Sequence, residues 1–162
     1  MSRKLGLAII GLGMASKPHA LAVRDLEDLV EVRGVFARSK EARAEFSKEY
    51  GFPSADSIDV LVDDPQTDAV LLITPPNARL EIISRFAKAG KHILCEKPLA
   101  RTLEEARQIV ETCENAGVHL GVVFQHRFRA ASQKLSELIG SGKLGAIYVV
   151  RAEVPWWRDQ TY

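Results

Sequence analysis

The sequence predicts an α/β protein with a doubly wound parallel sheet. Short apolar runs alternate along the chain with longer segments of helical periodicity, the pattern of repeated strand–helix–strand units. Glycine, proline and helix-capping residues stand between these segments, and no repeat or low-complexity linker interrupts them. A length of 162 residues allows one domain with a little chain left over. We therefore expect one complete domain and only the start of a second.

The first two strands and the helices that follow them are the clearest elements. We expect the first strand at Leu5–Ile10, a helix over about residues 15–26 and a second strand at Val30–Phe36. Ser39 is placed to cap the next helix, which carries Ala42, Phe46 and Tyr50. Gly51 and the residues after it end that helix.

The middle of the chain continues the alternation. Ile58, Leu61 and Val62 predict a short helix that ends at residues 63–65, and Ala69–Thr74 is an apolar strand. Asn77 is expected to cap a helix that ends at Gly90. The inward face of that helix is predicted to hold Leu80, Ile83 and Ala87. His92–Cys95 is the next strand.

A capping box opens the following helix. Thr102 and Glu105 predict a helix to Ala116, ended by Gly117. We expect its inward residues to be Leu103, Ala106, Ile109 and Val110. A further strand is predicted at His119–Phe124.

The end of the chain is expected to leave this repeating pattern. A last helix is predicted near Ala131–Ile139, and Ala146–Val154 has the pattern of a strand. We assign residues 1–125 to the complete domain. Residues 126–162 would be a connecting helix and the first strand of a second domain.

Composition excludes several classes of protein. The chain is 46% hydrophobic with a net charge of +1, so no basic excess indicates nucleic-acid binding. No apolar stretch approaches the ~20 residues of a membrane helix, and we expect a cytoplasmic protein. Cys95 and Cys113 lie far apart, so we expect two small buried hydrophobic residues and no metal site.

A glycine-rich turn follows the first strand and opens the first helix. In open parallel sheets, ligands bind outside the carboxyl ends of the strands, and a helix N-terminus there favours phosphate. Gly11 would allow a tight turn, Gly13 would allow backbone to approach a pyrophosphate, and Ser16 stands where a third glycine is common. The expected cofactor contacts are Gly11, Leu12, Gly13, Met14 and Ala15.

The end of the second strand indicates a cofactor preference. A site for NAD usually places an acidic residue here, whereas this chain has Ala37, Arg38 and Ser39. Arg38 could bind the 2′-phosphate of NADP, and Ser39 is expected beside it. The alternative is a solvated arginine at a helix start. We expect NADP or NAD, with a modest preference for NADP.

Two further motifs follow later strands of the sheet. Thr74, Pro75 and Pro76 hold the chain extended, so that it can pass a flat ligand, and Asn77 can face a ribose; a rigid turn is the alternative. Glu96 and Lys97 then pair a carboxylate with an ammonium at a strand end.

Strand alternation points Glu96 and Lys97 in opposite directions. Only one of the two side chains can therefore face the cleft in a regular strand, and we expect it to be Lys97, with Glu96 beside it among the cofactor contacts. We assign the catalytic role to Lys97, because its reach and tunable pKa suit that role.

These motifs together resemble the glucose–fructose oxidoreductase, inositol dehydrogenase and rhizopine-catabolism (Gfo/Idh/MocA) family. The resemblance rests on the glycine turn at 11–16, Thr74-Pro75-Pro76-Asn77, Glu96-Lys97-Pro98 and the strand end at 124–128. It implies a Rossmann domain followed by a substrate domain whose Asp and His serve proton transfer. It also implies a soluble enzyme that transfers hydride between NAD(P) and a secondary alcohol of a sugar, inositol or related polyol.

The resemblance carries implications for single residues. It puts Lys97 near the nicotinamide and the reacting hydroxyl, suggests a cis Lys97–Pro98 bond, and brings Arg127 to cofactor or substrate. Leu80 departs from the family, which often has histidine there. His19 has no partner that the sequence identifies.

Other implications concern the whole protein. The family implies a homo-oligomer at full length and an inactive chain without the second domain, with Trp156 and Trp157 facing the sugar side. A non-catalytic dinucleotide-responsive regulator of the same fold is the alternative. A methyltransferase-type domain is disfavoured by Glu96-Lys97-Pro98.

Overall fold

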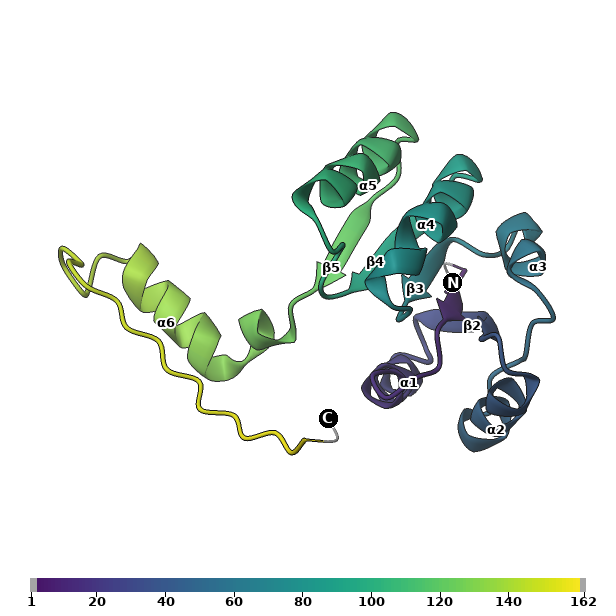
Figure 1. Cartoon of the computed structure of the whole chain (residues 1–162), viewed down its shortest axis with the longest axis horizontal. Helices are drawn as coiled ribbons and strands as arrows, with labels where there is room; N and C mark the ends of the chain where they lie inside the picture. The colour runs from purple at the N-terminus through teal and green to yellow at the C-terminus, as the bar shows by residue number, and fades with distance from the viewer. Residues whose placement is uncertain (1–2, 161–162) are drawn as a thin grey trace. The chain divides into compact units, whose positions relative to one another are not determined.

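The computed structural model describes residues 3–160 and divides into two units, one that ends at Val123 and one that begins at Phe124 (Figure 1). Among the described residues, no helix is both long enough and apolar enough to cross a bilayer.

The first unit is a parallel sheet with helices on both faces. Its described strands are β1 (Leu5–Ile10), β2 (Val30–Phe36), β3 (Ala69–Leu72), β4 (His92–Glu96) and β5 (Leu120–Val123). Its helices are α1 (Ser16–Asp25), α2 (Lys40–Tyr50), α3 (Ile58–Asp63), α4 (Arg79–Lys88), α5 (Leu103–Asn115) and the 3-10 helix η1 (Pro76–Ala78).

The strand order is β2-β1-β3-β4-β5, and every pairing is parallel. The chain therefore moves outward from β1 to β2, crosses back to β3 and continues in the opposite direction. This reversal creates a switch point between β1 and β3, where open α/β sheets bind ligands. The predicted doubly wound sheet is confirmed.

The register aligns the carboxyl ends of four strands. Ile10 pairs with Phe36 on one side and with Leu72 on the other, and Leu72 pairs with Cys95. The segments that follow β1, β2, β3 and β4 consequently leave the sheet from the same edge.

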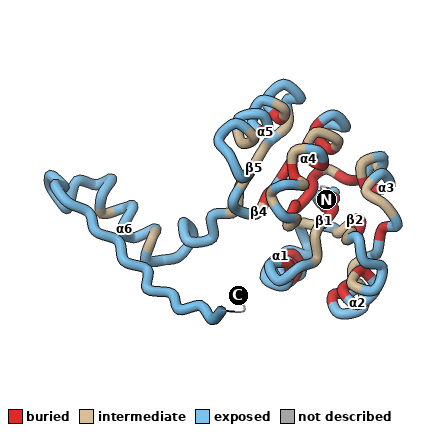
Figure 2. Tube along the Cα trace, viewed as in Figure 1, coloured by how far each residue is buried: buried red, intermediate tan, exposed pale blue. Residues whose placement is uncertain are grey.

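The core has one layer on each face of the sheet. Side chains alternate along β1, so Ala8 and Ile10 join the cluster under α3, α4 and α5, while Leu7 and Ile9 join the cluster under α1 and α2. Figure 2 shows the buried residues concentrated in the strands and the inward helix faces. All of β3 is buried. Burying a valine or leucine side chain of this strand stabilises the fold by ~1.5–3 kcal/mol.

Both cysteines are free and buried, as predicted. Cys95 lies in β4 and Cys113 in α5, and both belong to the cluster under α3, α4 and α5. Burial raises the pKa of each thiol. They therefore serve as small apolar core residues.

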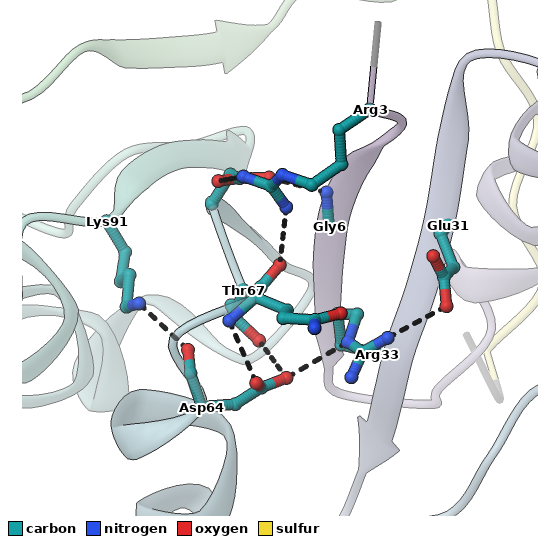
Figure 3. A network of polar contacts seen from close by, with 9 residues as sticks. Arg3, Gly6, Glu31, Arg33, Asp64, Thr67 and Lys91 are labelled. Carbon is teal, nitrogen blue, oxygen red and sulfur yellow. Dashed lines mark hydrogen bonds and ion pairs between the residues drawn. The ribbon is translucent and has the colours of Figure 1, made fainter. Parts of the chain in front are cut away.

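A polar network closes the amino ends of the strands (Figure 3). Asp68 accepts hydrogen bonds from Arg3 at 2.6 Å and from the Gly6 backbone at 2.7 Å. Asp64 accepts from Arg33 at 3.0 Å and from the Thr67 hydroxyl at 3.1 Å. The network lies at the edge opposite the cofactor motifs, so we assign it to stability.

Two predictions about the helices, one on a cap and one on an inward face, are wrong. Asn77 does not cap α4, because Pro76 starts η1 one residue earlier and the N-cap position falls on Ala78, which makes no side-chain cap. In α5, Leu103 is 67% exposed and Val110 is 37% exposed. This helix covers the margin of the sheet, so only a narrow stripe with Ile109 and Cys113 is buried.

The second unit contains the 3-10 helix η2 (Gln125–Phe128) and helix α6 (Ala130–Gly140), close to the predicted helix. The strand predicted at 146–154 is not formed. An isolated strand leaves its ladder hydrogen bonds unmade, and no described residue pairs with this segment. Trp156 and Trp157, which follow this segment, are exposed.

Candidate functional site

The switch point between β1 and β3 gathers the motifs found in the sequence. The glycine turn follows β1, the Thr74–Asn77 segment follows β3, and Lys97 follows β4. The aligned register brings these segments to one edge of the sheet. The site is therefore assembled by neighbouring strands that are distant in sequence.

Gly11 is fixed by packing as well as by conformation. Its φ is +97°, and a Cβ added there would lie 2.7 Å from the Ile73 carbonyl carbon and 2.7 Å from the Thr74 backbone nitrogen. Its own N–H donates to the Phe36 carbonyl at 2.9 Å. No side chain fits between the ends of β1 and β3, so glycine is required here.

Gly13 is free of such packing and faces open space. A Cβ added to Gly13 would meet no atom within 4 Å. Behind it, Ser16 is buried, and its hydroxyl donates to the Gly13 carbonyl at 2.7 Å. The Gly13 backbone is thus fixed by the hydrogen bond from Ser16, and the side where a Cβ would stand is open.

The other turn residues leave the start of α1 open to an anion. Met14 is 94% exposed, Ala15 is the N-cap residue of α1, and the first turn of α1 carries no acidic residue. Leu12 packs partly against the core under α1 and α2. A helix N-terminus with an unobstructed glycine in front of it suits a pyrophosphate, so these residues fit a dinucleotide.

The turn after β2 presents a cation. Arg38 is exposed, and no side chain in residues 3–160 forms an ion pair with it. Ser39 caps α2, accepting from the Ala42 N–H at 3.1 Å and donating to Glu41 at 2.8 Å. The backbone N–H of Glu41 and then the Ser39 hydroxyl lower the pKa of that carboxyl. The prediction that Ser39 caps this helix is confirmed, and its hydroxyl is engaged in these two hydrogen bonds.

The segment after β3 alternates between half-buried and exposed residues. Thr74 is half-buried, and its Oγ1 has no hydrogen-bond partner in the described part of the chain. Pro75 and Asn77 are exposed, and Pro76 is half-buried. Since Asn77 caps no helix, its amide is available at the surface.

Arg79 joins the segments after β3 and β4, and sequence reasoning missed it. It is 2% exposed, and its Nε and Nη2 donate to the Thr74 carbonyl at 2.9 and 2.8 Å. Its Nη1 donates to the carbonyls of Glu96 and Pro98. The helical periodicity could have identified it, because Arg79 lies on the inward stripe of α4 with Ile82, Ile83 and Phe86, where a charged residue is unusual.

Glu96 is held by α1. Its Oε1 lies 2.8 Å from Nε2 of His19, and its Oε2 accepts the Lys97 N–H at 2.9 Å. His19, for which the sequence offered no partner, therefore links α1 to the end of β4. The Lys97 side chain is exposed, and the Lys97–Pro98 bond is cis, as expected.

Two residues singled out in the sequence take no part in these contacts. Arg127 is exposed in η2 and belongs to the second unit. Leu80, where we noted a departure from the family, packs partly against the core under α4. No group of three or more possible metal ligands occurs in the described residues.

The arrangement offers two chemical functions at one edge. The glycine turn and the start of α1 can hold a pyrophosphate. Lys97, on a backbone fixed by Arg79 and Glu96, can donate a hydrogen bond to an oxygen at the neighbouring strand end.

Known proteins are similar to this chain in sequence and in fold. Residues 5–124 match an oxidoreductase family with an NAD-binding Rossmann fold. A 1,5-anhydro-D-fructose reductase of Ensifer adhaerens is 40% identical over 116 residues, covering 71% of this chain and 35% of that protein. A myo-inositol 2-dehydrogenase of Thermotoga maritima is 31% identical over 150 residues, covering 90% of this chain and 43% of that protein.

A solved structure is also similar. The WlbA dehydrogenase of Bordetella pertussis in complex with NADH and UDP-GlcNAcA has a TM-score of 0.84 and 31% identity, covering 90% of this chain and 45% of that chain. The chain thus spans less than half the length of each of these relatives.

Proposed function

The chain belongs to the glucose–fructose oxidoreductase, inositol dehydrogenase and MocA family of oxidoreductases, and from this membership we propose that it is the cofactor-binding part of an NAD(P)-dependent sugar or polyol dehydrogenase. The reaction would move a hydride between the nicotinamide and a secondary alcohol carbon. Sugar and inositol substrates are supported by the names of the relatives, which include a reductase of an anhydro-sugar and an inositol dehydrogenase.

One observation carries this proposal. The close approach of Gly11 to Ile73 and Thr74 leaves no room for a side chain, while the space at Gly13 is empty. Together they form a turn shaped for a backbone-to-phosphate contact at the switch point of the sheet. A turn that merely reversed the chain would not require both features.

The chain's own residues would bind and orient the reactants. A nicotinamide cofactor supplies the hydride chemistry when it is bound. The Gly13 backbone and the start of α1 would hold the pyrophosphate, and Thr74–Asn77 would lie along the ribose. Lys97 would donate a hydrogen bond to the alcohol oxygen and stabilise negative charge there as its proton leaves. The resemblance assigns the proton acceptor to the substrate domain of the family.

The proposed preference for NADP depends on Arg38. One charge-assisted contact to a 2′-phosphate is worth ~1.5–3 kcal/mol, which corresponds to roughly ten- to hundredfold in affinity. The absence of a paired carboxylate on Arg38 in residues 3–160 supports this role. The NADH in the similar WlbA structure shows what that protein binds and leaves NAD as the competing choice for this chain.

Turnover by the complete protein that carries this chain tests the proposal. Inositols, aldoses and anhydro-sugars would be incubated with NADP and NAD, and formation of the reduced nicotinamide would be followed. Lys97→Ala should lower kcat by ~10²–10⁴-fold, whereas Lys88→Ala, on the exposed end of α4, should leave it unchanged. Cofactor binding without oxidation of any alcohol would favour a dinucleotide-responsive regulator.

We further propose that the protein works in the cytoplasm, which is supported by two buried cysteines that form no disulfide in the described residues.

A further inference from the structure

We propose that Arg79 is a positioning residue whose buried guanidinium sets where Lys97 stands relative to a bound nicotinamide. The inference rests on the proposed function, because Lys97 has this role only if a dinucleotide binds at this edge of the sheet. It goes further by assigning the geometry of Lys97 to a side chain that touches neither cofactor nor substrate.

Four hydrogen bonds of the Arg79 guanidinium go to main-chain carbonyls of two separate segments. The acceptors are Thr74, after β3, and two residues at the end of β4, its last residue Glu96 and Pro98 beyond it. The planar fork of an arginine can reach both segments at once, whereas the single ammonium of a lysine cannot. Arg79 therefore ties the end of β4 to the end of β3.

The carbonyls of Glu96 and Pro98, which Arg79 contacts, belong to the two residues on either side of Lys97. Between them, the Lys97 N–H donates to Oε2 of Glu96 at 2.9 Å, and Oε1 of Glu96 contacts His19. The backbone of Lys97 is thus fixed on both sides, while its side chain is exposed. A fixed backbone confines the ammonium to the region that the side chain can reach from that point.

The location of Arg79 on α4 indicates that packing alone does not explain it. It occupies the same inward stripe as Ile82 and Phe86, where an apolar residue would be expected. No carboxylate in residues 3–160 forms an ion pair with it, and four hydrogen bonds to main-chain carbonyls stabilise its charge. A buried cation is costly without such partners, which makes the bridge between the two segments its evident structural role.

The test compares two ligands on the 162-residue chain. The dissociation constants of the preferred reduced dinucleotide and of the same molecule without its nicotinamide, ADP-ribose or its 2′-phosphate, would be measured. Arg79→Lys should weaken dinucleotide binding by about tenfold and change binding of the fragment by less than about twofold, since only the nicotinamide end meets Lys97. Methylguanidinium should restore dinucleotide binding to Arg79→Ala, and ammonium chloride at equal ionic strength should not.

Arg43 provides a matched control. It is also buried, at 6% exposure, and also donates to main-chain carbonyls, those of Ala55 and Asp56. Arg43→Ala should leave the ratio of the two dissociation constants unchanged. Hydrogen exchange should rise at residues 74–78 and 96–100 in the Arg79 variants, and near residues 55–56 in Arg43→Ala.

A variant at the exposed Lys97 keeps the test independent of folding at the buried position. Lys97→Ala should show the same selective loss of dinucleotide binding as Arg79→Lys, and combining the two should add nothing further. An equal loss of both ligands in Arg79→Lys, or unchanged dinucleotide binding in Lys97→Ala, would overturn the role of Arg79 and leave the dinucleotide site standing. A wild-type chain that binds neither ligand would overturn the proposed function itself.

Discussion

The Nε2 atom of His19 lies 2.8 Å from Oε1 of Glu96, which joins the helix after the glycine turn to the end of β4. Both side chains are largely buried, with 17% and 13% of their surface exposed. Glu96 also accepts the Lys97 N–H. The cofactor end and the catalytic end of the proposed site are thus coupled by one short chain of hydrogen bonds.

Removing His19 should destabilise this coupling. His19→Leu leaves the Glu96 carboxylate with no side-chain partner in a largely buried place, so the free energy of unfolding should fall by about 1–3 kcal/mol. Glu96→Gln retains an oxygen and should cost less. Urea unfolding of both variants and of the double variant measures the coupling energy, and additive losses would show that the contact contributes nothing.

The two glycines of the turn should respond differently to alanine. Gly11→Ala places a Cβ against the backbone of β3 at a positive φ and should lower the free energy of unfolding by more than about 2 kcal/mol. Gly13→Ala meets no atom and should change it by less than about 0.5 kcal/mol. Thermal and urea unfolding would measure both variants.

Gly13→Ala should nevertheless weaken dinucleotide binding by at least about tenfold, because the new Cβ occupies the approach of the pyrophosphate. A stable Gly13→Ala chain with unaltered affinity would remove the pyrophosphate from this turn.

The carboxylates at the amino edge predict a loss of stability in acid. The hydrogen bond from Arg3 lowers the pKa of Asp68 below its ordinary 3.8. Partial burial raises the pKa of Asp64, but hydrogen bonds from the Gln66 backbone, Arg33 and Thr67 outweigh it and lower the net pKa. A carboxyl with a depressed folded pKa stabilises the protein above its ordinary value, and this contribution disappears as pH falls through the folded pKa.

Urea unfolding between pH 6 and pH 2 measures this contribution. The free energy of unfolding should decline below about pH 4, and the decline should be shallower in Asp68→Asn, which cannot titrate. An identical pH profile in Asp68→Asn would contradict the assignment. Glu41→Gln, at the start of α2, tests a further carboxyl with a lowered pKa.

Local patterns predicted the strands and most helix ends well. β1 and β2 were placed at their observed bounds, because apolar runs between capping residues define them. Ser39 and Thr102 were identified as caps because capping acts over three residues. The strand at 146–154 was wrong because a strand depends on a partner that local pattern does not supply.

The site was predictable in outline and not in its supporting contacts. The glycine turn and the Glu96-Lys97-Pro98 motif follow strands, so topology alone brings them to one edge. The contact of His19 with Glu96 spans 77 residues, and that of Arg79 with Pro98 spans 19. Contacts of this kind depend on how α1 and α4 are rotated on the sheet, which helical periodicity defines only to within a stripe.

Calorimetric titration of the chain with NADP and NAD tests the dinucleotide site most directly. We expect NADP to bind roughly ten- to hundredfold more tightly than NAD, and we expect Arg38→Ala to remove most of that difference. Arg107→Ala, at an exposed position on α5, should leave it intact. Tighter binding of NAD would overturn the role of Arg38 alone, whereas no heat of binding with either dinucleotide would contradict the site itself.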